Sequence, residues 1–136
     1  MQDILPQAPS IPSEVPERAG AYLGQALAAL HAPAGAVMLA ASAVDAMLKA
    51  KGYLEGTLYS RIEMAATQHL ITNDMKEWAH EVRLDANDQR HSDNLTALPI
   101  EADARRVVDF AQALATFLFV LPARVQRGRQ DAKRKT

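Results

Sequence analysis

Hydrophobic residues recur every three or four positions along most of the chain, the spacing that places them on one face of an α-helix. In the first such segment, Leu23, Leu27 and Leu30 share a face, and Pro16 suits the first turn. Five helices are predicted in this way, over about residues 16–31, 33–51, 57–70, 73–91 and 100–121 or beyond.

Start and stop signals support several of these boundaries. Pro33 can open the second helix and Gly52 can end it, while Thr57 is a plausible N-cap for the third helix and the segment Thr72-Asn73-Asp74 offers caps for the fourth. The extension of the fourth helix to His91 is assumed from the spacing. Because no segment alternates β-branched and polar residues, the sequence predicts an all-α fold, a single up-and-down bundle of four to five helices.

Composition divides the chain into three parts. The 136 residues are 49% hydrophobic, enough for one core. Prolines at positions 6, 9, 12 and 16 predict an extended arm over residues 1–15, followed by the bundle over residues 16–123. Residues 124–136 form a basic tail of net charge +5, against -6 for the rest of a chain whose net charge is -1. Such a tail can bind nucleic acid phosphates, or it is a solvated helix end.

The same composition bears on the compartment. Cysteine is absent, so thiol chemistry and disulfides are excluded. The proline-rich start lacks the basic and apolar regions of a signal peptide. The apolar stretch 32–50 contains Asp45, which is costly in a membrane, so we expect a buried helix in a cytoplasmic protein and no membrane partner.

Asp45 is the first candidate functional residue. It lies in AVMLAASAVDAML, whose small residues allow close helix packing and a central place in the bundle. A carboxylate there needs a partner if it is buried. The alternative is that Asp45 points to solvent.

The stretch RLDANDQRH, residues 83–91, is the second candidate. At about 100° per residue, Arg83, Asn87, Arg90 and His91 fall on one polar stripe that borders the core. Histidine can move a proton, arginine can hold a phosphate and an amide can orient a hydroxyl, which suits metal-independent RNA cleavage or phosphate binding. The structural alternative is that Arg83 or His91 pairs with Asp45 or a carbonyl.

The sequence contains no motif that is typical of a metal site or a cofactor site. The four histidines lack the spacing of a metal-binding helix, and His69 and His80 are expected at the surface or core edge. The glycines are scattered and form no phosphate-binding loop. We therefore expect neither a metal nor a cofactor.

Four segments resemble a bacterial family, the domain of unknown function 4145. The resemblance covers about residues 36–123, with Asp45 at the family's acidic position and Arg83, Asn87 and His91 at the positions of its R..GN..AH motif. The segments are AASAVDAMLKAKG, LYSRIEMAATQHLIT, EVRLDANDQRH and EADARRVVDFAQALATFLFVLP.

That family is similar to the HEPN (higher eukaryotes and prokaryotes nucleotide-binding) group of helical bundles, many of which are ribonucleases of defence or toxin systems. The resemblance implies a homodimer in which His91 transfers protons, Arg83 contacts phosphate and Asn87 orients the substrate, with Asp45 bracing Arg83 or His91. The chain departs from the pattern at Ala86, which replaces a glycine, and at Arg90, which replaces a small residue. Arg90 either replaces Arg83 as the cation of the motif or blocks the cleft that the motif lines. The interval from Arg83 to His91 is also longer than in the nuclease motif.

Three functions follow from these patterns. The first is a nucleic-acid-related binding or interaction module that serves with a partner protein in a bacterial or phage defence system. The second is a metal-independent ribonuclease that acts as a homodimer. A module that binds RNA or other nucleic acid through the basic tail alone is the third.

Overall fold

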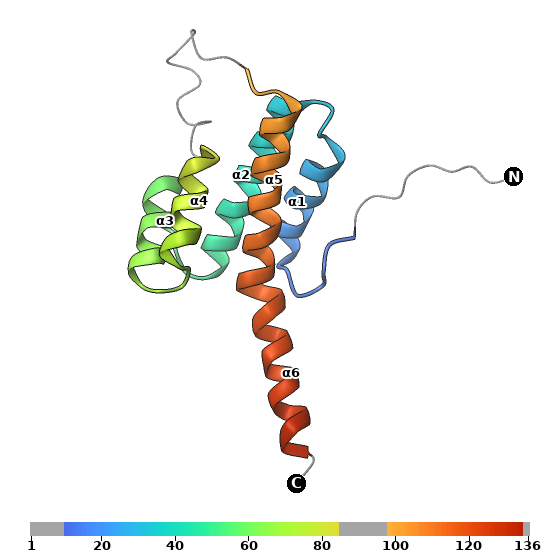
Figure 1. Cartoon of the computed structure of the whole chain (residues 1–136), viewed down its shortest axis with the longest axis vertical. Coiled ribbons are helices and arrows are strands. Elements are labelled where there is room, and N and C mark those ends of the chain that lie inside the picture. The colour runs from blue at the N-terminus through green and yellow to red at the C-terminus, as the bar shows by residue number, and fades with distance from the viewer. Residues whose placement is uncertain (1–9, 85–97, 135–136) are drawn as a thin grey trace, which may run out of the picture.

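The computed structural model describes residues 10–84 and 98–134, and every regular element in these two ranges is helical. The predicted all-α fold is therefore confirmed. Figure 1 shows a bundle from which the last helix projects. In chain order the elements are α1 (Glu17–Ala28), α2 (Pro33–Ala50), α3 (Leu58–Thr67), α4 (Asn73–Glu81), α5 (Glu101–Ala115), the π-helical turn η2 (Thr116–Val120) and α6 (Leu121–Arg134).

Helix α2 is the centre of the bundle. It packs chiefly against α1 and α5, and its alanines allow the close approach predicted from AVMLAASAVDAML. By length and composition alone, α2 and the continuous helix Glu101–Arg134 could each cross a membrane. In the folded bundle α2 instead buries eight residues against its neighbours: Ala36, Val37, Ala40, Ala41, Ala43, Val44, Met47 and Leu48.

The predicted N-cap of α3 is confirmed, and of the three residues predicted to offer a cap for α4, Thr72 caps the helix. The Thr57 hydroxyl accepts a hydrogen bond from the Ser60 backbone N–H at 3.1 Å, and the Ser60 hydroxyl accepts one from the Thr57 N–H at 2.9 Å. The Thr72 hydroxyl accepts from the Met75 N–H at 3.0 Å. These bonds satisfy amide groups that have no partner within their own helices.

Helix α4 is shorter than the sequence analysis predicted. It ends at Glu81, and Arg83 adopts the left-handed conformation with φ 60°. The Arg83 N–H donates to the His80 carbonyl at 3.0 Å, and Leu84 is buried immediately afterwards. A left-handed residue followed by an apolar contact is a common helix ending. The prediction of a helix through Arg83 is therefore wrong, because the burial of Leu84 turns the chain where no glycine marks an end.

The predicted fifth helix continues far beyond position 121. It is regular over α5, widens into the π turn η2 and continues as α6 to Arg134. Pro122 follows the π turn directly; it has no N–H to donate, and its ring crowds the carbonyl four residues earlier. A π turn at this point accommodates the proline without breaking the helix.

Candidate functional site

Asp45 forms an ion pair that joins α2 to α3. Arg61, in the first turns of α3, donates from Nη2 to Asp45 Oδ1, and from Nη1 to the Gly56 carbonyl at 2.5 Å. Lys49 Nζ lies 3.1 Å from Asp45 Oδ2. The Arg61 side chain is 9% exposed and that of Asp45 is 26% exposed. Asp45 therefore has the partner that a half-buried carboxylate needs, and this partner is Arg61 rather than Arg83.

Arg61 was given no role in the sequence analysis, although it is the arginine of LYSRIEM. It is the only charged residue buried among the described residues, and its Nε has no hydrogen-bond partner there. A charged residue on the otherwise apolar face of α3 could have indicated a buried ion pair. The sequence did not indicate the partner, because Asp45 lies 16 positions earlier in another helix. The contact with Asp45 makes Arg61 a structural residue of the bundle.

Arg83 lies beyond the end of α4 and is not helical. The polar stripe predicted over residues 83–91 assumed a helix there, so its first residue does not have the predicted position. Its side chain is exposed, and within the described part of the chain no hydrogen bond or ion pair engages the guanidinium. Asn87, Arg90 and His91 lie outside the described residues. Of the four residues of this stripe, the structure therefore describes Arg83 alone.

A second polar cluster, which the sequence analysis missed, joins α3 to α4. His80 Nε2 lies 2.7 Å from Glu63 Oε2, and the His80 ring stacks on Tyr59 with 4.6 Å between ring centroids. Tyr59 and Glu63 are four positions apart and so share one face of α3. The intermediate burial of His80 agrees with its predicted place at the core edge. These contacts hold the short helices α3 and α4 together.

Helix α6 carries the basic tail as ordered helix. It extends away from the bundle (Figure 1) and has no buried residue. Over Leu121–Arg134 it carries five basic residues and one acid, a net charge of +4. Arg127 Nη1 lies 3.5 Å from Glu14, whereas Arg124 and Arg129 have no ion pair within the described ranges. Helix α6 is therefore an exposed helix with a positive net charge.

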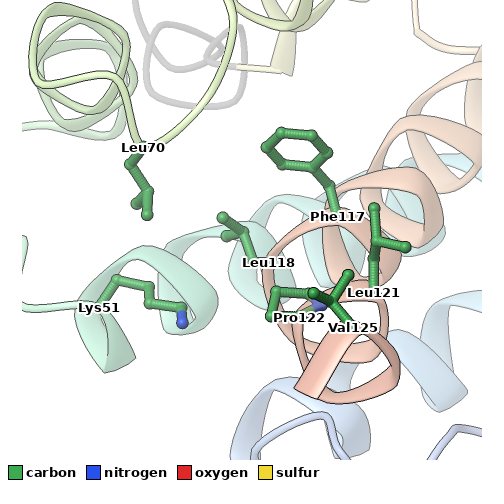
Figure 2. Close-up of a pocket in the computed structure, with 7 residues that line it drawn as sticks. All are labelled: Lys51, Leu70, Phe117, Leu118, Leu121, Pro122 and Val125. Atoms are coloured by element: carbon green, nitrogen blue, oxygen red, sulfur yellow. The ribbon is translucent and has the colours of Figure 1, made fainter. Parts of the chain in front are cut away.

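A hollow of about 410 Å³ lies where α6 leaves the bundle. Figure 2 shows side chains from η2 and α6 on one side and Lys51 and Leu70 on the other. Lys51 Nζ lies 4.7 Å from the centroid of the Phe119 ring, a cation–π contact. The lining is otherwise apolar: Leu70, Phe117, Leu118, Leu121, Pro122 and Val125.

The described residues contain no group of three or more histidine, cysteine or acidic side chains that could hold a metal ion. No curated protein and no solved structure matches the chain. A family model, described as a domain of unknown function, matches residues 25–133. The match includes nearly all of α6, so the projecting basic helix lies within the region that the family model covers. Since the match spans most of the chain, the protein belongs to the family of the domain of unknown function DUF4145.

Proposed function

We propose that this protein is a nucleic-acid-binding helical module whose contact surface is α6. The observation that carries this proposal is the exposed basic helix itself, with a net charge of +4 and no buried residue. A cationic surface binds phosphates by releasing the counterions that surround them. Arg127 pairs with Glu14 at 3.5 Å, but Arg124 and Arg129 have no ion pair among the described residues and lie beyond the core.

The geometry of α6 favours contacts to the phosphate backbone. Fourteen helical residues extend for about 21 Å, a length along which several phosphates of either strand lie. Leu121–Arg134 contains no aromatic residue on which a base could stack. We therefore expect binding with little dependence on sequence and a strong dependence on salt.

Fluorescence anisotropy with labelled RNA and DNA duplexes tests this proposal. The double variant Arg124→Gln/Arg129→Gln removes the two α6 arginines that have no ion pair among the described residues. Its affinity should fall roughly tenfold or more, and the slope of log affinity against log salt should become shallower by about 1.8.

The double variant Arg105→Gln/Arg106→Gln is the matched control. It removes the same charge from α5, where the two arginines already pair with Glu101 at 2.6 Å and Asp103 at 2.8 Å. This variant should bind nearly as the wild type does. Equal losses in both variants would mean that net charge alone, rather than α6, determines binding.

A second candidate function is metal-independent RNA cleavage by a homodimer, with Arg83, Asn87 and His91 in the roles that the family resemblance implies. The exposed guanidinium of Arg83, free of protein partners in the described ranges, favours it. Labelled RNAs incubated with EDTA should be cleaved by the wild type but not by folded His91→Ala or Arg83→Ala. Intact RNA with the wild type across single-stranded and structured substrates would count against this activity. A defence system is the biological context that we propose for either function.

A further inference from the structure

The base of α6 presents apolar side chains that the bundle does not cover. Leu121 is 43% exposed and Val125 is 51% exposed, and both line the hollow beside η2 (Figure 2). Helices of soluble proteins normally bury such a face against another element. Helix α6 buries no residue and meets the rest of the described chain through the Arg127–Glu14 pair at 3.5 Å, so a partner on its apolar face would add to its stability.

The backbone shapes this surface. The π turn Thr116–Val120 changes the helical register just before Pro122, and Phe117 and Leu118 of this turn line the hollow together with Leu121. Single π turns within α-helices occur frequently at functional sites. The hollow is open to solvent and has a volume of about 410 Å³. The hollow can therefore receive a cluster of apolar side chains.

Charge indicates what kind of partner fits. Lys51 is the one charged residue among those that line the hollow. On α6, Arg124 and Arg129 flank Val125 on opposite sides, at about 100° and 40° around the helix axis. An apolar centre bordered by cations is complementary to an apolar surface bordered by carboxylates.

We propose that this surface, made of the hollow with Leu121 and Val125, is a docking site for an amphipathic helix of a partner protein with acidic residues beside its apolar face. A helix lying in an apolar groove is a common mode of recognition. The α6 helix of a second copy fits poorly, because its own net charge of +4 would face Lys51, Arg124 and Arg129. The apolar side chains that line the hollow cannot donate hydrogen bonds to phosphates. The proposal does not depend on nucleic-acid binding.

Two labelled synthetic helical peptides with the same leucine face test the proposal, one flanked by glutamate and the other by lysine. Anisotropy with the full chain should show that the glutamate peptide binds at least tenfold more tightly. Leu121→Gln and Val125→Gln should each weaken that binding at least fivefold, and Lys51→Glu should reduce the preference for the glutamate peptide. Met38→Gln is the control, since Met38 is 40% exposed but does not line the hollow.

Several results would overturn the proposal. One is equal binding of the two peptides; another is binding that Val125→Gln leaves unchanged while circular dichroism shows a folded chain. Sedimentation that reveals a dimer abolished by Val125→Gln would assign the surface to a second copy. Because the test contains no nucleic acid, its failure leaves the proposed function of α6 intact, and loss of nucleic-acid binding in Arg124→Gln/Arg129→Gln leaves the hollow intact.

Discussion

Removing Asp45 should destabilise the bundle more than removing its partner Arg61. Asp45→Ala leaves the buried Arg61 guanidinium, whose side chain is 9% exposed, with the Gly56 carbonyl as its one acceptor in the described part of the chain. Breaking a buried ion pair by removing one partner costs about 3–5 kcal/mol. Because the Asp45 side chain is 26% exposed and part of the cost is screened, we expect the lower end, about 3 kcal/mol.

The reverse substitution is milder. Arg61→Met keeps an unbranched apolar chain in the same space, and the remaining carboxylate of Asp45 keeps Lys49 at 3.1 Å and partial contact with water. The expected loss is about 1 kcal/mol, close to the value of an ordinary hydrogen bond. Asp45→Ala/Arg61→Met removes both charges, so it should also lose only about 1 kcal/mol. The second substitution therefore rescues the first.

Urea unfolding followed by far-ultraviolet circular dichroism measures all three variants as free energies of unfolding. Lys49→Met is the control, because its side chain is 49% exposed and surface pairs contribute about 0–1 kcal/mol. Equal losses in the two single variants, or additive losses in the double variant, would refute the assignment of Arg61 as a buried cation that depends on Asp45.

Three further substitutions test the packing and the turns. Gly56→Ala should cost about 1–3 kcal/mol by thermal unfolding, because φ is +85° and the new Cβ would lie 2.3 Å from Ser60 Oγ; an unchanged melting temperature would contradict this. Phe110→Ala should cost about 3–5 kcal/mol in urea and should alter the fluorescence of Trp78, whose ring centroid is 5.1 Å away; a tolerated variant would mean that this core is not closely packed. His69→Gly should stabilise α3 by up to about 1 kcal/mol, because His69 adopts φ 63° where glycine is unstrained, and a loss of stability would show that its side chain contributes more than the strain costs.

The sequence predicted the elements whose signals are local. Helical spacing identified apolar faces that the bundle buries, among them that of Leu23, and Thr57 and the segment Thr72-Asn73-Asp74 marked two helix starts. A cap acts over three or four residues, so its evidence is contained in a short stretch of sequence. The number and order of the helices could therefore be predicted without tertiary information.

Features that depend on tertiary contacts were not predicted. The end of α4 at Glu81 follows from the burial of Leu84, and Arg83 carries no residue-type signal for the left-handed conformation. The partner of Asp45 was equally hidden, since Arg61 comes from another helix. Two cations, Arg61 and Arg83, were both present in the sequence, and only the packing of α3 against α2 distinguishes the structural arginine from the exposed one.

Arg83 and α6 lie far enough apart to act separately. Helix α4 ends toward the end of the bundle where α5 begins, whereas α6 leaves from the opposite end (Figure 1). Phe110 contacts Trp78 of α4, and the helix from Phe110 to Leu121, where α6 begins, is about 17 Å long at 1.5 Å per residue. A duplex of six base pairs, about 20 Å long, can lie along α6 without reaching Arg83 in the same protomer. RNA cleavage at Arg83 that also requires α6 would therefore need a longer RNA or the α6 of a second protomer, and the dependence of cleavage on RNA length distinguishes the two.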